Sequence, residues 1–176
     1  SAGIKWLALG IEAGSQMVRQ EVSKGSFKEV NIRNITAMIN EHNINIIANY
    51  IVGFPEDTYS TMTSTLNLAL ELNAEMMNVY PCQALPGSPL YIKAKNEGWD
   101  IPKDYEEFAF LSYECKPLPT KTLSSADVLR FRDYFWNTYF QNPAYLDKVE
   151  LSFGAAQREN VEEMAKHKLK RKILEN

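Results

Sequence analysis

The chain has 176 residues, of which 45% are hydrophobic and 23% are charged, so it suits one globular domain or one domain with a tail. A formal net charge of -3 gives no overall attraction to nucleic acid or to an anionic membrane, and no apolar run is long enough to span a bilayer. Two cysteines, Cys82 and Cys115, are too few for a disulfide framework or a cysteine-rich metal site. We therefore expect a reducing, cytoplasmic setting.

The chain starts at Ser1 and enters a strand pattern almost at once. We expect that further residues precede it in the full protein; the alternative is a complete domain from which a tag was removed. Residues 6–11 form an apolar run broken only by Gly10, which is typical of a buried strand in a parallel sheet covered on both faces. A short helix is predicted over 16–22 and a longer one over 29–42, with Asn43 as its left-handed cap.

A second strand is predicted over 44–52 and is ended by Gly53-Phe54-Pro55. Asp57 or Thr58 can cap the next helix, which runs to about Leu72.

A third strand is predicted over 75–80. Pro86-Gly87 then forms a turn, and a helix begins at Pro89 after Ser88 and ends at Gly98. This alternation of strands and helices predicts an α/β fold of successive parallel βαβ units, either a barrel or a doubly wound sheet.

The remainder of the chain has a different pattern. Residues 99–123 are irregular and rich in proline and aromatic residues, which indicates a packed loop over the scaffold. A helix is expected from Ser125 until Pro143 stops it, and a last, mostly polar helix over about 157–174. The basic run 166–172 is interpreted as a solvated helix end, so nucleic acid is not an expected partner.

Ligands of parallel α/β folds bind beyond the carboxyl ends of the strands, so the candidate site lies there. Glu12 could accept hydrogen bonds from a ribose diol or an ammonium group, or could cap the following helix. Ser15 could contact the same ligand or serve as the N-cap of the short helix. Lys24 could reach an anionic group such as a ligand carboxylate, or could be an exposed lysine near a helix end.

Three further candidates follow the second and third strands. Gly53 could let a flat ring lie against the backbone, or could simply be a turn residue. Tyr80 could stack on a base and Gln83 could hydrogen-bond to it, or they could be a rim aromatic and an exposed amide.

Three segments, taken together, resemble strands four, five and six of the barrel of radical S-adenosylmethionine (SAM) enzymes. The similarity is greatest to the cobalamin-dependent and related subfamilies, and the second segment departs from the family in having Glu56-Asp57 where Gly-Glu is usual. The segments are Leu7–Ser15 with Val22–Gly25, then Asn49–Thr58, then Tyr80–Leu90.

The resemblance implies that residues 1–99 are the C-terminal half of a partial (β/α)6 TIM-like barrel and that residues 100–176 add an irregular loop and C-terminal helices. It also implies a set of SAM-contacting positions. Glu12 and Ser15 would contact the ribose or methionine part, Lys24 would pair with the carboxylate, and the adenine would be edged by Asn49, Gly53, Tyr80 and Gln83.

The family binds a [4Fe–4S] cluster with a Cys-x3-Cys-x2-Cys run after strand one, and this chain contains no such run. The resemblance therefore implies cluster ligands upstream, in an N-terminal half-barrel that would be the partner of this chain. Cobalamin, where used, would bind an upstream domain. We expect this polypeptide alone to be inactive and assign it no catalytic residue. The alternative function is a noncatalytic half-barrel interaction module that dimerises or pairs with a partner chain.

Overall fold

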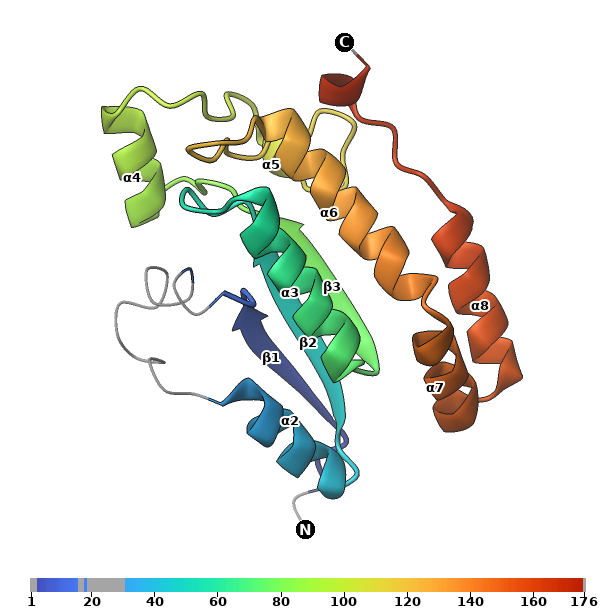
Figure 1. Cartoon of the computed structure of the whole chain (residues 1–176). Helices are drawn as coiled ribbons and strands as arrows, with labels where there is room; N and C mark the ends of the chain where they lie inside the picture. Colours follow the sequence, from blue (N-terminus) through green and yellow to red (C-terminus); the bar gives the residue numbers. More distant parts are fainter. Residues whose placement is uncertain (1–2, 16–17, 19–30, 176) are drawn as a thin grey trace.

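The computed structural model describes residues 3–15, Val18 and residues 31–175. Within these residues the chain forms three β-strands, seven α-helices and one short 3-10 helix (Figure 1). The elements are β1 (Trp6–Glu12), α2 (Ile32–Glu41), β2 (Asn45–Val52), α3 (Tyr59–Leu72), β3 (Met76–Pro81), α4 (Pro89–Asn96), α5 (Tyr105–Phe108), α6 (Ser125–Phe140), α7 (Pro143–Phe153), α8 (Ala155–Lys166) and η1 (Lys172–Leu174).

The three strands form one parallel sheet in the order β1-β2-β3. The register places Gly10 beside Asn49 and Asn49 beside Asn78, and an irregularity interrupts the β1–β2 pairing between Gly10 and Glu12. This arrangement confirms the predicted α/β fold with parallel strands, because β1 and β2 are each followed by a crossover that returns the chain to the same end of the sheet.

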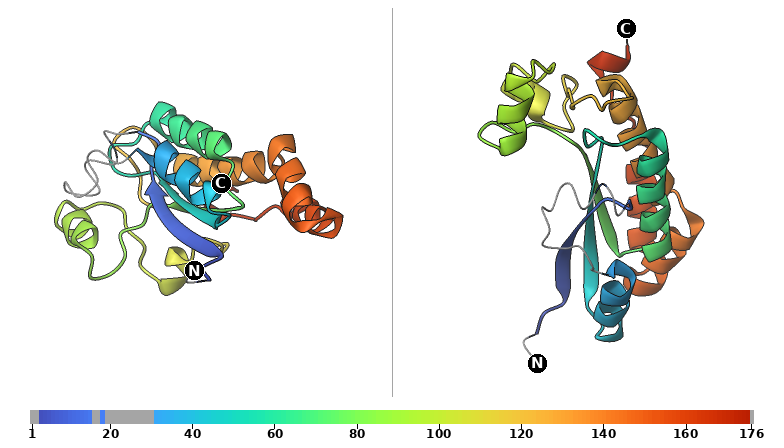
Figure 2. Two further views of the ribbon diagram at one scale, coloured as in Figure 1. Left: turned by 90° about the horizontal axis from the view of Figure 1, so that it is seen from below. Right: turned by 60° about the vertical axis from the view of Figure 1, so that its left-hand side comes forward.

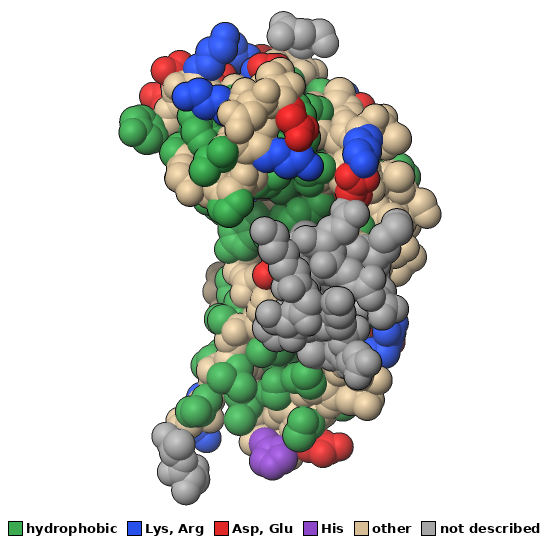
Figure 3. Space-filling view, turned by 90° about the vertical axis from the view of Figure 1, so that its left-hand side faces the viewer, with side chains coloured by type: hydrophobic (Ala, Val, Ile, Leu, Met, Phe, Trp, Pro, Cys, Tyr) green, Lys and Arg blue, Asp and Glu red, His purple; other side chains and the backbone are tan. Residues whose placement is uncertain are grey.

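Helices cover one face of the sheet, and in the described part of the chain the other face is covered only at its carboxyl end, where Ile51 packs with Ala94 and Leu118. Side chains of β2 alternate strictly between buried and half-buried, and α2, α3 and α6 pack on the buried side (Figure 2, right). Trp6 and Met76 on the opposite face are 41% and 45% exposed. The space-filling view shows a molecule hollowed along one side, with hydrophobic side chains exposed along the hollow (Figure 3).

The expectation that residues 6–11 form a strand covered on both faces is therefore wrong. The strand itself is confirmed, but only Ile11 of β1 is buried, and residues 6, 8 and 10 are exposed. The apolar run does not require cover on both faces, because Ala8 and Gly10 have small side chains and expose little apolar surface. Leaving these two positions uncovered therefore costs little free energy.

Capping residues lie at the starts and ends of the helices where the sequence predicts them. Thr58 forms a capping box with Thr61 at the start of α3, and Asn73 takes a left-handed conformation at its end. Asn43 is also left-handed after α2, and Ser88 caps α4 ahead of Pro89. These local signals fix the element boundaries to within one to three residues.

The helix expected from Ser125 ends at Phe140, before Pro143, as predicted. The sequence analysis missed α7, of which Pro143 is the first residue, at a position where its missing N–H costs nothing. The last helix covers 155–166 instead of 157–174, because the chain extends after Lys166 to bring Arg171 into a buried ion cluster. Gly154, with φ of 90°, separates α7 from α8.

The C-terminal helices share one hydrophobic core with the sheet. Tyr50 of β2 packs against Phe135 of α6 with ring centroids 5.7 Å apart. The Tyr139 hydroxyl donates a hydrogen bond to the Ala74 carbonyl at 2.7 Å, and the Tyr145 hydroxyl donates to the Glu75 carbonyl at 3.2 Å. These contacts anchor α6 and α7 along the start of β3.

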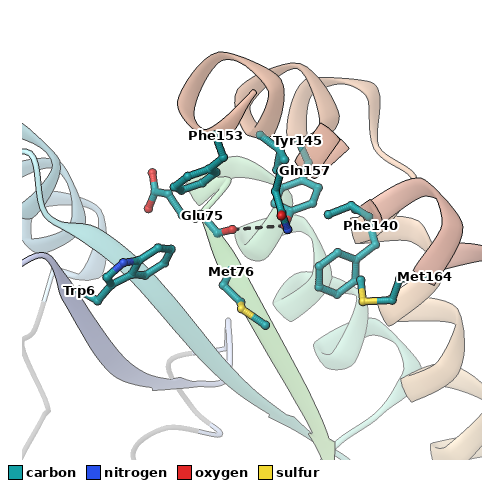
Figure 4. Close-up of a pocket in the computed structure, with 10 residues that line it drawn as sticks. Trp6, Glu75, Met76, Phe140, Tyr145, Phe153, Gln157 and Met164 are labelled. Atoms are coloured by element: carbon teal, nitrogen blue, oxygen red, sulfur yellow. Dashed lines mark hydrogen bonds between the residues drawn. The ribbon is translucent and has the colours of Figure 1, made fainter. Parts of the chain in front are cut away.

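At the amino ends of the strands, α7 and α8 border an apolar basin of about 250 Å³ (Figure 4). The Trp6 ring of β1 stacks on Phe153 of α7 with centroids 5.9 Å apart, and Met76 of β3 also lines the basin. No helix among the described residues is both long and apolar enough to cross a bilayer.

Gly53 and Gly87 provide a matched test of how tightly α6 packs on the end of β2. Both have φ near 85°, but a Cβ on Gly53 would lie 2.3 Å from Val128 Cγ1, whereas nothing lies within 4 Å of one on Gly87. We expect Gly87→Ala to lower the free energy of unfolding by about 1–2 kcal/mol through backbone strain alone. Gly53→Ala should cost about 1–3 kcal/mol more.

Urea denaturation of both variants measures the difference. Val128→Ala in the Gly53→Ala background should recover most of the additional loss. Equal destabilisation by the two alanine substitutions would contradict the close packing of Val128 on Gly53.

Candidate functional site

A row of polar groups crosses the open face of the sheet. Gly10, Asn49 and Asn78 lie side by side in register on β1, β2 and β3. The Asn78 side-chain amide donates a hydrogen bond to Asn49 Oδ1 at 3.0 Å, and the Asn49 amide donates to the Leu9 carbonyl at 3.3 Å. The two asparagines are thus fixed in orientation, with amide groups displayed on a face that is otherwise mostly apolar.

Glu12 is the charged member of this row. It has a left-handed backbone, with φ of 64°, at the irregularity that ends β1. A Cβ on Gly10 would lie 2.7 Å from Glu12 Oε1, so the carboxylate folds back over Gly10 toward the register position of Asn49. Only glycine at position 10 leaves room for this conformation. Burial raises the pKa of the Glu12 carboxyl above its ordinary value.

The loop after β1 is held against α3, which fixes the position of Glu12. The Gly14 N–H donates to Thr65 Oγ1 at 2.9 Å, and a Cβ on Gly14 would meet the Ser64 carbonyl oxygen at 2.5 Å. The Val18 N–H donates to Ser15 Oγ at 3.5 Å, a long bond in the geometry of an N-cap. Lys24 lies outside the described residues.

Gly53 lies at the end of β2 and is buried. The space on its Cα is filled by Val128 of α6. Asp57 Oδ2 accepts hydrogen bonds from the N–H groups of Gly53 and Phe54, each at 2.9 Å, and so closes the turn. Burial raises the Asp57 pKa, while these hydrogen bonds and one from Thr61 oppose the rise. Asp57 thus holds the turn, and Thr58 caps α3.

Tyr80 and Gln83 both contact the irregular segment that follows α4. The Tyr80 ring meets Phe110 edge to face, with centroids 4.9 Å apart. The Gln83 amide donates to the Glu107 carbonyl at 3.1 Å and lies 3.8 Å from Cys115 Sγ. The structure thus places Glu12 and Asn49 on either side of Gly10 on the open face, and it holds Tyr80 and Gln83 against the segment between α4 and α6.

The residues present do not fit an iron–sulfur cluster. The whole chain has two cysteines, and the family cluster needs three thiolates. Both are buried, and burial raises the pKa of Cys82 to about 12 and of Cys115 to about 11, so they remain thiols. In the part of the chain that is described, no group of three or more His, Cys, Asp or Glu side chains could hold a metal ion.

Asn78 is the site residue that the sequence reasoning missed. It lies two positions before Tyr80, so both side chains point to the same face of β3. The signal in the sequence was a polar residue inside the third strand, two positions from the candidate Tyr80 and so on the same face.

The burial of the Glu12 carboxyl predicts how stability depends on pH. A folded-state pKa raised above the unfolded value means that the native state loses stability as pH rises through the folded pKa. We expect Glu12→Gln to raise the urea midpoint at pH 7, with the gain vanishing below the ordinary carboxyl pKa of 4.5. Glu41→Gln, at an exposed position of α2, is the control and should change little. A Glu12→Gln protein less stable at pH 7 would indicate a favourable partner for the carboxylate instead.

Comparison with known proteins gives partial similarities to two kinds of enzyme. No protein-family model matches the chain. The chain is 29% identical over 150 residues to an anaerobic magnesium-protoporphyrin IX monomethyl ester cyclase from Rubrivivax gelatinosus, over 84% of this chain and 26% of that protein.

It is 31% identical over 90 residues to tRNA-2-methylthio-N(6)-dimethylallyladenosine synthases from Mannheimia succiniciproducens and Haemophilus influenzae, over 49% of this chain and 18% of each relative. The chain thus spans about a fifth to a quarter of the length of these relatives. Both kinds of relative are radical SAM enzymes, a group whose cofactors are SAM and a [4Fe–4S] cluster. The similarities support a relationship of this chain to the radical SAM superfamily, and nothing finer.

Proposed function

We propose that this chain is the SAM-binding C-terminal half of a radical SAM enzyme barrel, with the open face of its sheet as the barrel interior. The observation that carries the proposal is the row across the open face, in which Glu12 folds back from the carboxyl end of β1 over Gly10, beside Asn49 and Asn78 on the next two parallel strands. Parallel α/β folds place their ligands at this end of the sheet. A sheet with one uncovered, partly polar face suits the inner wall of a barrel.

The residues of the row fit part of SAM. The half-buried Glu12 carboxylate can accept hydrogen bonds from a ribose diol or from the ammonium group, and a buried carboxylate gains most from such a partner. The asparagine amides offer both donors and acceptors next to it. Ser15 and Lys24 remain proposed contacts of the methionine part, and Gly53, Tyr80 and Gln83 remain proposed neighbours of the adenine.

The cluster ligands must come from outside these 176 residues, since two buried thiols cannot replace three cluster-binding thiolates. In this proposal they lie in an N-terminal half-barrel that pairs with β1, whose outer edge carries no strand among the described residues. Cobalamin, where used, would occupy a further domain. The role of this chain is to bind and orient SAM, and the cluster supplies the electron that cleaves it.

SAM binding can be tested on this chain by amide NMR. We expect added SAM to shift the backbone amides of Gly10 and Glu12 and the side-chain amides of Asn49 and Asn78. Glu12→Gln should weaken binding about tenfold, because a hydrogen bond to a charged group is lost. Gly10→Ala should weaken it as well, because the new methyl group displaces the Glu12 carboxylate.

Glu41→Gln is the matched control and should bind SAM as the unmodified chain does. Shifts confined to other parts of the molecule would contradict the proposed site. With SAM and a chemical reductant, the chain alone should form no 5′-deoxyadenosine, as measured by liquid chromatography. Formation of that product would overturn the division of roles between this chain and a cluster-binding part.

We also propose that the chain self-associates when alone, because its open face leaves apolar side chains in water. Light scattering after size exclusion should give a mass above 20.1 kDa at micromolar concentration. The double variant Trp6→Lys, Met76→Lys should shift the protein toward the monomer. Leu151→Lys is the control: Leu151 is 89% exposed and lies about 200° around α7 from Phe153. A strict monomer for the unmodified chain would refute the proposal.

A further inference from the structure

A second cavity, of about 290 Å³, lies beside β3, with Asn78 in its wall. It is enclosed by β3, α6 and the segment after α8, which run beside one another in Figure 1. Its walls are largely apolar, with Phe110, Trp136, Met164 and Leu169 among them. Its size is at the small end of the range, about 300–1,000 Å³, that is usual for ligand pockets.

Buried charge at the wall of this cavity is unbalanced. Arg132 and Arg171 share a single carboxylate, Asp133, with N–O distances of 2.9 Å to each guanidinium. Both arginine side chains are almost fully buried, at 5% and 0% exposed. The cluster therefore carries one positive charge in excess in a desolvated position, and such a charge is costly unless an anion accompanies it.

Arg132 presents this charge to the cavity. Its Nε donates to the Val79 carbonyl at 2.9 Å and its Nη1 donates to Asp133, while its guanidinium lies over the Phe110 ring, 5.5 Å from the centroid. Among the described residues no hydrogen bond engages Nη2, so this nitrogen is left for a ligand.

A second polar group of the cavity wall also lacks a partner. The Asn137 Nδ2 donates to the Asp133 carbonyl at 2.8 Å, which fixes the amide, but its buried Oδ1 accepts no hydrogen bond from the described residues. A buried acceptor without a donor costs free energy, and a ligand N–H or O–H would satisfy it. Asn137 lies on α6 one turn after Asp133, and Arg132, Asp133 and Asn137 all line this cavity.

We propose that this cavity binds a small carboxylate with an apolar body and one hydrogen-bond donor close to the carboxylate. The carboxylate pairs with Arg132, the donor bonds to Asn137 Oδ1, and the body packs among Phe110, Trp136 and Met164. The proposal uses a different ligand from SAM and different contacts, although Asn78 of the row also lines this cavity.

Mandelate is a suitable probe, because it joins a carboxylate and a hydroxyl to a phenyl ring. We expect a saturable shift of the Trp136 indole N–H in an NMR titration, with the signal assigned from Trp136→Phe and with Trp6 and Trp99 unchanged. Mandelamide, without the charge, should bind at least about tenfold more weakly. Phenylacetate, without the hydroxyl, should bind severalfold more weakly.

Asn137→Asp keeps the size of the side chain and adds a negative charge next to Arg132, so it should abolish mandelate binding. Arg130→Gln removes an exposed cation from the same helix and should leave binding unchanged. Thermal unfolding of both variants separates loss of binding from loss of the fold. Equal affinity for mandelate and mandelamide, shifts at Trp6 or Trp99 instead, or no saturable shift up to about 10 mM would overturn the proposal.

Discussion

One-sided burial of the parallel sheet is the constraint on which the rest of this structure depends. Side chains on one face of β2 lie under α2, α3 and α6. On the other face the described chain covers only the carboxyl end, where Ile51 packs in a second apolar cluster with Ala94 and Leu118. Parallel sheets are usually covered on both sides, since their strands are apolar on both faces. The uncovered face therefore needs either a partner or a function. The same face presents both the polar row across the middle of the strands and the apolar basin at their amino ends.

The polar row depends on backbone conformation as much as on side-chain chemistry. Glu12 reaches over the sheet only because its φ is positive and because position 10 has no side chain. Gly14 holds the following loop on α3 at a distance that no other residue permits. Each glycine of the Gly10-to-Gly14 segment thus has a separate structural task, and the joint result is a carboxylate fixed at the end of β1.

The C-terminal helices complete the core and protect the outer edge of β3. The Arg132 side chain donates a hydrogen bond to the Val79 carbonyl at that edge. The Tyr139 and Tyr145 hydroxyls donate hydrogen bonds to the backbone carbonyls just before the strand. These bonds cap an edge that would otherwise present free backbone groups. The edge of β1 has no equivalent among the described residues. The two edges therefore differ: this chain closes the β3 edge, whereas none of the described residues pairs with the outer edge of β1.

Sequence alone determined the parallel α/β order, the strand limits, the helix caps at Asn73 and Ser88, a cap at Asp57 or Thr58, and the candidate Glu12, because these follow from local periodicity and turn chemistry. Asn49 was a candidate only through the resemblance to radical SAM enzymes. Only the tertiary structure decided which sheet face is covered, that Asn78 joins the row, that Val128 fills the space at Gly53, and that Arg171 ends the last helix early. The reason is physical. Hydrophobic periodicity reports that a residue can be buried, but the element that buries it is distant in sequence and leaves no local trace.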